Sequence, residues 1–217
     1  MTKSVRIVDL GLTEYQATYA KMRAFTDARD SASRDEIWLT EHEPVFTQGQ
    51  AGRPQHILFN SEIPVVQSNR GGQVTYHGPG QITAYLLFDL RRLGLSVTQL
   101  VNRIEQLMLN VCANCGITAG RREGAPGIYV GNDKIGALGL RVSRGCSYHG
   151  LSLNVEMDLR PYEQINPCGL TDVRAIDMQA FGSHTIASVK PLVIAEALRV
   201  FDLEQITERS ESTARES

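Results

Sequence analysis

One stretch of the sequence constrains the fold more than any other, because it holds three strand-like segments joined by two short turns. Gly127–Val130 and Lys134–Val142 flank Gly131-Asn132-Asp133, a tripeptide typical of a hairpin turn. Tyr148–Val155 follows a second turn at Arg144-Gly145. Strands joined by turns this short run in opposite directions, so the sequence predicts three consecutive antiparallel strands here.

The rest of the chain predicts further strands and three long helices. Strands are expected at Val5–Leu10, Ile37–Glu41, Pro44–Phe46, Val65–Ser68, Gln73–Tyr76 and Ile82–Leu87. Capping-box patterns predict helices opened by Thr13 with Gln16 and by Ser96 with Gln99, and a last helix is expected at Ser188–Phe201. We predict an α+β fold in which helices cover a mainly antiparallel sheet, as one domain over residues 1–203 with a polar, mobile tail at 204–217.

The composition excludes several classes of protein. The 217 residues are 42% hydrophobic and 21% charged, which is typical of a globular domain. A formal net charge of -2 gives no long-range attraction to nucleic acid or to an anionic membrane. No apolar stretch approaches the roughly 18 to 20 residues that span a bilayer, so we expect a cytoplasmic protein. Four cysteines are too few for a disulfide scaffold.

The segment Arg70–Gln81 is rich in glycine and surrounds a predicted strand that carries Tyr76 and His77. Glycines let the backbone approach a ligand closely, but two tight turns around a strand would explain them equally well. Arg70 favours a loop that binds a polar ligand. No Gly-Lys-Ser/Thr follows and no helix opens after the segment, so it is neither a phosphate-binding loop nor a dinucleotide fingerprint.

Lys134 and Cys168 are the side chains best suited to catalysis. Lys134 stands beside small residues, where partial desolvation would lower its pKa, although a solvated turn lysine fits the same pattern. Cys168 lies between Pro167 and Gly169, which could display its thiol. A thiol needs a cationic or basic neighbour to become a nucleophilic thiolate near neutral pH, and Lys134 could be that neighbour. A buried, inert cysteine is the alternative.

The histidines and the other cysteines give fewer indications of a catalytic or metal-binding role. His42, His77 and His149 could each pair with a cysteine instead of Lys134, and the sequence does not rank them. Cys112 and Cys115 form a C-x-x-C, but no second pair of ligands lies nearby to complete a zinc site, so no metal is expected.

Four ordered motifs together resemble the lipoyl(octanoyl) transferase family. They are Arg70-Gly71-Gly72 with Thr75–Gln81, Lys134–Gly139, Tyr148–Leu151 with Asn154-Val155, and Pro167-Cys168-Gly169. The resemblance covers nearly the whole chain except the polar tail. It implies a fold similar to the catalytic domains of biotin and lipoate protein ligases, which are related to class II aminoacyl-tRNA synthetases.

The resemblance also implies a reaction and its partners. Octanoyl-acyl carrier protein would donate an octanoyl group, first to Cys168 as a thioester and then to a lysine of a lipoyl domain. The acceptors would be E2 subunits of 2-oxoacid dehydrogenases and the glycine-cleavage H protein, with no nucleic acid or membrane involved. Lys134 would lower the pKa of Cys168 and relay protons, and neither ATP nor a metal would be required.

By the same resemblance, three walls would surround the acyl chain. His42 and His149, considered above on their own sequence surroundings, are expected as accessory residues. The walls are formed by Arg70, Gly71, Gly72, Gln73, Val74, Thr75, Tyr76 and His77, by Ala137, Leu138 and Gly139, and by Gly150, Leu151 and Ser152. Gly136 and Ser152 stand where many relatives carry alanine, which could change the width of the tunnel or the preferred acyl chain.

Two other functions remain open. An ATP-dependent lipoate or biotin ligase of the same fold would activate a free acid and would need no cysteine nucleophile, so the Cys168 motif argues against it. A silent module that binds a carrier protein or a lipoyl domain would have no need of both Lys134 and Cys168.

Overall fold

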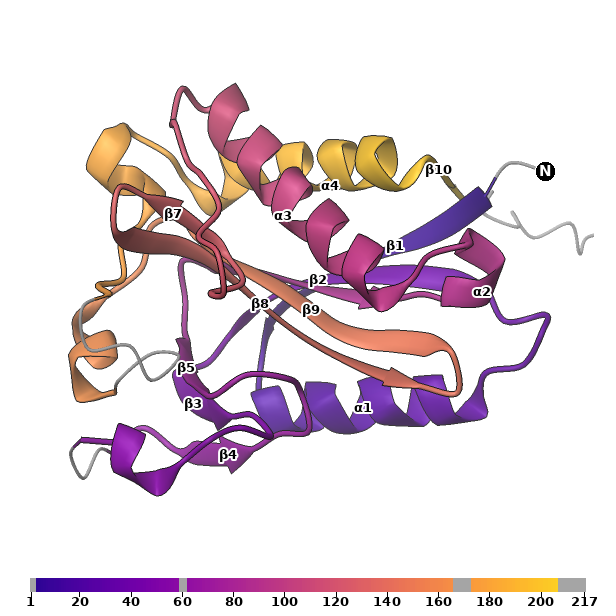
Figure 1. Cartoon of the computed structure of the whole chain (residues 1–217), viewed down its shortest axis with the longest axis horizontal. Coiled ribbons are helices and arrows are strands. Elements are labelled where there is room, and N and C mark those ends of the chain that lie inside the picture. Colours follow the sequence, from indigo (N-terminus) through magenta and orange to yellow (C-terminus); the bar gives the residue numbers. More distant parts are fainter. Residues whose placement is uncertain (1–2, 59–61, 166–172, 207–217) are drawn as a thin grey trace, which may run out of the picture.

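The computed structural model describes residues 3–58, 62–165 and 173–206, and its centre is a seven-stranded sheet (Figure 1). In spatial order the strands are β10 (Leu203–Gln205), β1 (Lys3–Thr13), β2 (Asp35–His42), β6 (Gln81–Leu87), β9 (Cys146–Asn154), β8 (Asp133–Ser143) and β7 (Ile128–Val130). The predicted antiparallel series β7, β8 and β9 is confirmed, with Ala137 opposite Ser152 and Gly139 opposite Gly150.

The other edge of this sheet is parallel. β1 pairs in parallel with β2 and with β10, and α1 (Tyr15–Ala28) crosses over between β1 and β2, because parallel neighbours cannot be joined by a tight turn. The fold is therefore α+β with a mainly antiparallel sheet, as predicted. β10 was not predicted: Glu204 and Gln205, assigned to the tail, belong to this strand. Residues 207–217 of the predicted tail lie outside the described residues.

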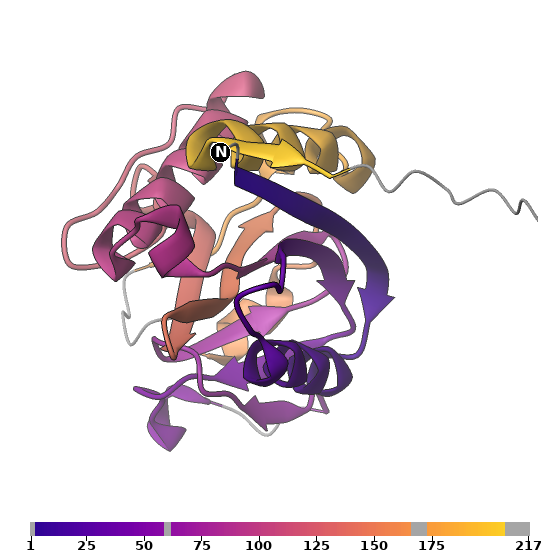
Figure 2. The same ribbon diagram turned by 90° about the vertical axis from the view of Figure 1, so that its right-hand side faces the viewer.

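A smaller sheet lies beside the large one, in the order β4 (Val65–Gln67), β3 (Val45–Gln48) and β5 (Val74–His77). The remaining helices are α2 (Leu90–Leu93), α3 (Val97–Asn114), α4 (Ile186–Phe201) and the short 3-10 turns η1 (Pro54–His56), η2 (Arg160–Gln164) and η4 (Met178–Phe181). Figures 1 and 2 show α3 and α4 together on one face of the large sheet and α1 on the other.

Of the two predicted helix caps, the one at the start of α3 is confirmed and the one at the start of α1 is wrong. Ser96 and Gln99 form the predicted capping box of α3. The predicted cap of α1, Thr13, is wrong: Thr13 ends β1, and the carboxylate of Glu14 accepts hydrogen bonds from the backbone N–H groups of Gln16 and Ala17 instead. β1 reaches Thr13 because Gly11 takes a left-handed conformation (φ 64°) that lets the strand continue beside β2.

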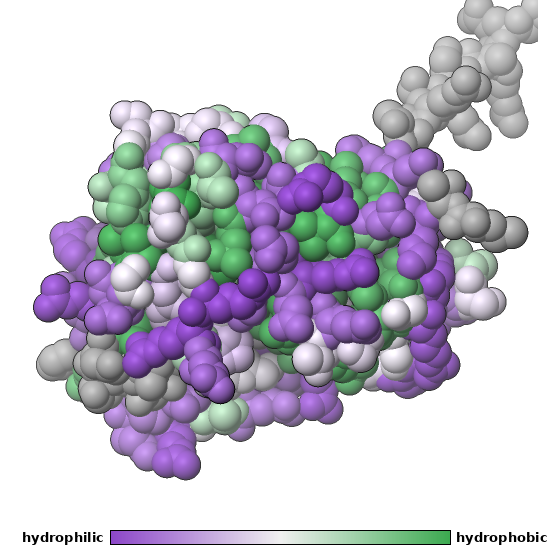
Figure 3. Space-filling view, turned by 45° about the horizontal axis from the view of Figure 1, so that its top comes forward, coloured by the Kyte–Doolittle hydropathy of each residue, from purple (hydrophilic) through white to green (hydrophobic). Residues whose placement is uncertain are grey.

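The main core lies between the large sheet and the helix pair α3 and α4. α3 buries Leu100, Ile104, Leu107, Met108 and Val111 at helical spacing against alternate residues of β6 and β9. Figure 3 shows hydrophilic side chains spread over the outer side of this helix layer, with hydrophobic ones between them. β6 and β9 are buried along their whole length, so their other face is covered as well.

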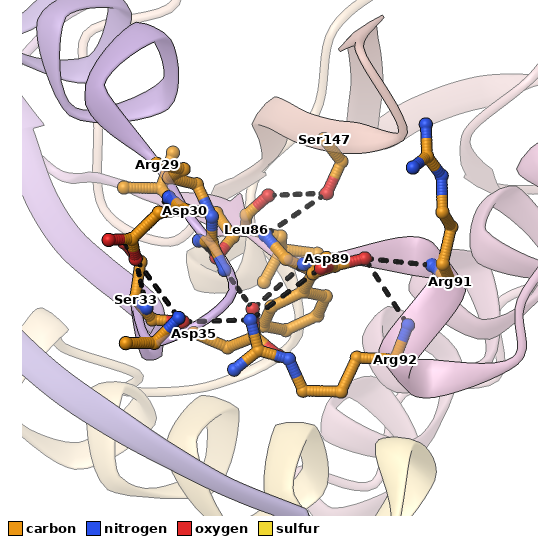
Figure 4. Close-up of polar contacts among 12 residues, drawn as sticks. Arg29, Asp30, Ser33, Asp35, Leu86, Asp89, Arg91, Arg92 and Ser147 are labelled. Carbon is orange, nitrogen blue, oxygen red and sulfur yellow. Dashed lines mark hydrogen bonds and ion pairs between the residues drawn. The ribbon is translucent and has the colours of Figure 1, made fainter.

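A buried ion pair holds the end of α1 to the sheet (Figure 4). The side chains of Arg29 and Asp35 are 3% and 2% exposed. Arg29 also donates to the Leu87 carbonyl (2.7 Å), and Asp35 accepts from the Asp89 N–H (2.7 Å). Burial raises the pKa of the Asp35 carboxyl, while the Asp89 N–H and the Arg29 guanidinium oppose that rise.

We predict that Arg29→Met lowers the free energy of unfolding by about 3–5 kcal/mol, because Asp35 would remain buried without its cation. Urea unfolding at pH 7 measures the change. Arg160→Met is the control, since Arg160 pairs with Asp158 at the surface, where their side chains are 85% and 47% exposed. The control should unfold almost as the wild type does. Equal stability of both variants would contradict the structural role of the Arg29–Asp35 pair.

Candidate functional site

A pocket lies on the face of the large sheet opposite α3 and α4, between that sheet and the small one. It holds about 820 Å³ of space between atoms, part of which is open to solvent. On β9, Leu153 packs into the core under α3, whereas Gly150, Ser152 and Asn154 line the pocket; Leu151 belongs to the core and also touches the pocket. This division follows from the alternation of side chains along a strand.

The structure brings most of the predicted wall residues together. Twelve of the fourteen line this pocket, namely Arg70, Gly72, Gln73, Val74, Thr75, His77, Ala137, Leu138, Gly139, Gly150, Leu151 and Ser152. Gly71 and Tyr76 do not line it. Tyr76 packs instead with Phe46 and Met157 under the small sheet, because its side chain lies on the other face of β5 from those of Thr75 and His77.

Two glycines that line the pocket let neighbouring backbone pack directly against β8 and β9. A Cβ atom on Gly150 would lie 2.0 Å from the carbonyl oxygen of Ala84, so only glycine fits this close to β6. A Cβ atom on Gly139 would lie 3.0 Å from the carbonyl oxygen of Gly71. Since Gly139 and Gly150 are paired across β8 and β9, the floor at this point is bare backbone.

Arg70 ties the glycine-rich loop to the small sheet. Its guanidinium donates to the carbonyl oxygens of Thr47 (2.6 Å), Gly71 (2.9 Å) and Gln73 (2.8 Å). The N–H of Gly71 donates to the Leu140 carbonyl of β8 (2.9 Å), which attaches the same loop to the large sheet. The structure therefore gives Arg70 a part in building the pocket, in addition to lining it.

Lys134 lies at the edge of the pocket and is 8% exposed. Its side chain is therefore largely removed from water, and the alternative of a solvated turn lysine is wrong. Its Nζ donates to the Pro126 carbonyl (3.2 Å) and lies 5.0 Å from the centre of the Tyr129 ring. Its backbone N–H donates to the Arg174 carbonyl (2.8 Å). Cys168 lies outside the described residues, so its separation from Lys134 stays a prediction.

Three histidines are held as buried neutral rings. Burial lowers the pKa of His42 to about 4. It lowers the pKa of His77 and of His149 to about 3, with the charge of Arg70 adding to the effect on both. His77 donates from Nδ1 to Oε1 of Gln81 (2.7 Å), and Nε2 of His42 shares a hydrogen bond with the Tyr85 hydroxyl (2.6 Å). His77 and His149 line the pocket, whereas His42 lies behind Tyr85.

His149 has a left-handed backbone (φ 61°), which is uncommon for a residue other than glycine. Tyr148 packs with Met22 of α1, and His149 lines the pocket. The His149 ring stacks on Tyr148 and on Tyr19 of α1, with ring centres 5.0 Å and 5.4 Å apart. Backbone strain of this kind is often found at functional sites.

Several lining residues were missed by the sequence reasoning. They are Tyr15, Thr83, Tyr85, Asn154, Tyr162, Val173, Arg174 and Ala175. Thr83 and Tyr85 alternate on β6 and could have been found from the pairing of β6 with β9. Tyr15 and Tyr162 come from distant segments and carry no local signal.

The arrangement suits a ligand with an apolar chain and one polar end. Polar side chains gather near Lys134, where Gln81 Nε2 donates to Asn154 Oδ1 (2.9 Å) and to the Tyr162 hydroxyl (3.1 Å).

Within the described ranges, no three His, Cys, Asp or Glu side chains are grouped so as to hold a metal ion. No helix in the same ranges is long and apolar enough to cross a membrane. Burial raises the pKa of Cys112 to about 12, so that its thiol stays protonated at pH 7.

The sequence and the fold of this chain are similar to those of known proteins. The sequence model of the lipoyl protein ligase A/B catalytic domain matches residues 14–198. An octanoyltransferase of Vibrio cholerae serotype O1 is 48% identical over 206 residues, which is 95% of each chain. An octanoyltransferase of Stutzerimonas stutzeri is 57% identical over 169 residues, 78% of this chain and 77% of the relative.

Among solved structures, a lipoate-protein ligase A bound with ATP is similar over 94% of this chain and 90% of the ligase. The TM-score is 0.78 and the identity 14%, so this likeness concerns the fold alone. It confirms the predicted similarity to lipoate ligases.

The buried histidines predict an acid-sensitive fold. An unfolded histidine takes up a proton near pH 6.5, whereas His77 and His149 in the folded chain do so only near pH 3. Below about pH 6.5 the unfolded chain therefore binds more protons than the folded chain, and a fall in pH favours the unfolded state. We expect the free energy of unfolding to decrease steadily from pH 6 to pH 4, with His77 contributing a slope of about 1.4 kcal/mol per pH unit.

Urea unfolding of the His77→Gln variant between pH 7 and pH 4 measures that slope. The variant should depend less steeply on pH than the wild type. His184→Gln is the control, because His184 lies outside the pocket. If His77→Gln keeps the full wild-type slope, His77 does not hold a neutral ring in the folded chain.

Proposed function

The chain belongs to the lipoyl protein ligase A/B catalytic domain family, and from that premise we propose that it transfers an octanoyl group from acyl carrier protein to a lysine of a lipoyl domain. Two sequence relatives that match 95% and 78% of its length are named octanoyltransferases. Cys168 is the proposed nucleophile, Lys134 the proposed proton carrier, and the acyl-enzyme is a thioester.

The observation that carries this proposal is the pocket with a buried lysine at its edge. The small residues Ala137, Gly139 and Gly150 line this pocket, which suits an unbranched alkyl chain. Lys134 lies where such a chain would end in a carbonyl group. The described chain resumes at Val173, shortly after Cys168 in sequence, and Val173, Arg174 and Ala175 line the pocket beside Lys134. This supports an approach of Cys168 to the same edge.

In the first step, the Cys168 thiol gives its proton to the Lys134 amine, and the thiolate attacks the carbonyl carbon of the carrier thioester. The bond from that carbon to the carrier sulfur breaks, and the departing thiolate takes the proton from the Lys134 ammonium. A thioester is exchanged for another of similar energy. A cysteine is suited to this exchange because a thiolate is both a strong nucleophile and a good leaving group.

In the second step, the amine of the target lysine attacks the carbonyl carbon of the Cys168 thioester. A C–N bond forms, the C–S bond breaks, and the proton lost by the amine passes through Lys134 to the Cys168 sulfur. An amide is far more stable than a thioester, so this step drives the reaction without a nucleotide. ATP and a metal are therefore not required in the proposed reaction.

The proposed acceptors are lipoyl domains of 2-oxoacid dehydrogenase E2 subunits and the glycine-cleavage H protein. An ATP-dependent ligase of the same fold is the rival, since a ligase of similar structure binds ATP. The much higher identity to octanoyltransferases favours the transferase.

The acyl-enzyme is tested by intact-mass analysis without ATP, first with octanoyl-acyl carrier protein and then with an apo lipoyl domain. We expect the wild type to gain one octanoyl group and to lose it to the domain, and the Cys168→Ser variant to complete no transfer. Cys115→Ser is the matched control, because Cys115 is a free, partly exposed thiol outside the pocket, and it should behave as the wild type. Modification that occurs only with octanoate and ATP would establish the ligase instead.

The proton carrier is tested with Lys134→Met, which keeps an unbranched side chain but removes the amine. We expect kcat for octanoyl transfer to fall by about 10²–10⁴-fold, the usual contribution of a positioned acid or base. Lys190→Met is the control, since Lys190 pairs with Asp9 at a distance from the pocket. Stopped-flow transfer assays give both rates. Wild-type kcat in Lys134→Met would remove Lys134 from the mechanism.

A further inference from the structure

Two hydroxyl groups lie side by side on the floor of the pocket. Thr83 of β6 is paired directly with Ser152 of β9, and Ser152 is paired with Ala137 of β8. Directly paired residues of antiparallel strands place their side chains on the same face. All three residues line the pocket, so this row of small side chains crosses its floor.

Neither hydroxyl has a hydrogen-bond partner among the residues that the structure describes. Thr83 is 2% exposed and its Oγ1 atom is buried without a partner. Ser152 is 5% exposed, and its hydroxyl also makes no hydrogen bond to the described residues, although its oxygen is not fully buried as that of Thr83 is. Ser147, on the same strand, is different: its hydroxyl donates to the Leu86 carbonyl (2.8 Å, Figure 4). Buried hydroxyls are nearly always hydrogen-bonded, so an unpartnered pair in a pocket points to a ligand.

The strand geometry shows which part of a ligand these hydroxyls would meet. Strands rise about 3.3 Å per residue, which puts the row of Ala137, Ser152 and Thr83 roughly 10 Å along the sheet from the Lys134 backbone. The bare pair Gly139 and Gly150 follows about 7 Å further on. On the proposed function, the acyl carbonyl lies near Lys134, so the middle carbons of the chain pass over the two hydroxyls.

We propose that the pocket binds medium-chain acyl groups that carry a hydroxyl on a middle carbon, with Thr83 and Ser152 as its hydrogen-bonding partners. An acyl hydroxyl can donate to one of these oxygens and accept from the other. A plain octanoyl chain leaves both unpartnered. The inference rests on the proposed function for the direction in which the chain lies. The hydroxylated chain would be transferred by the same two steps as octanoyl.

Binding is measured without turnover, by calorimetric titration of the full-length Cys168→Ser protein with N-acetylcysteamine thioesters. The probes are 5-hydroxyoctanoyl thioester and its 2-hydroxy isomer, which has the same composition but places the hydroxyl beside the carbonyl. We expect the 5-hydroxy isomer to bind at least tenfold more tightly. Adding Thr83→Val and Ser152→Ala to the Cys168→Ser protein should reduce the ratio of the two affinities, 5-hydroxy to 2-hydroxy, at least tenfold. Adding Ser147→Ala, which removes a hydroxyl of the same strand outside the pocket, should leave the ratio unchanged.

Equal affinity for the two isomers would overturn the inference, as would a ratio that does not respond to the paired substitution. The two hydroxyls would then hold water only. These outcomes are independent of the transfer assay, because the titration needs no acyl-enzyme. A protein that fails to transfer octanoyl but distinguishes the isomers would refute the proposed function and leave the pocket assignment standing. Circular dichroism of each variant verifies that it is folded.

Discussion

The attachment of the small sheet to the large one is the constraint on which the site depends. Arg70 gathers the carbonyl oxygens of Thr47, Gly71 and Gln73 around one guanidinium, and Gly71 bonds to Leu140 on β8. Without these contacts the loop at 70–73 would not be held above the floor of β8 and β9, and no pocket would form. A charged side chain is used here as a structural link, and its burial is tolerated because its N–H groups are matched by carbonyl oxygens.

The same arginine shapes the electrostatics of the pocket. Burial is the main reason that His77 and His149 stay neutral, and the nearby positive charge of Arg70 strengthens the effect. Neutral rings can hydrogen-bond and stack without attracting counter-ions into the site. This environment suits an uncharged thioester with an apolar chain, and the buried Lys134 amine lies at its edge where proton transfer would be needed.

Local patterns predicted the three antiparallel strands over 127–155, which β7, β8 and β9 confirm. The assignment of three segments as walls of an acyl site came from the resemblance to the lipoyl(octanoyl) transferase family, and twelve of the fourteen wall residues line one pocket. The error at Thr13 arose because Glu14 competes for the same N–H groups. β10 could not be predicted from its polar residues, since a short edge strand is defined by the neighbour it pairs with.

The remaining lining residues needed the tertiary structure. Tyr15 of α1 and Tyr162 of η2 reach the pocket from segments far apart in the sequence, and no periodicity in either segment indicates it. The left-handed His149 is set by its packing between Tyr19 and Tyr148 rather than by its own preference. Cys168, the residue that the motifs singled out most clearly, is the one whose surroundings the described residues do not include.

The position of β1 has a consequence for how the chain is made. Residues 3–5 pair on one side with residues 203–205, so β1 is synthesised about 200 residues before the strand that completes its edge. The pocket, by contrast, is lined by residues between Tyr15 and Ala175. During synthesis, which proceeds from the N-terminus, the walls of the site are therefore available before the sheet edge is closed. The pairing of β1 with β10 is long-range and therefore slow to form, and it completes the sheet without lining the pocket.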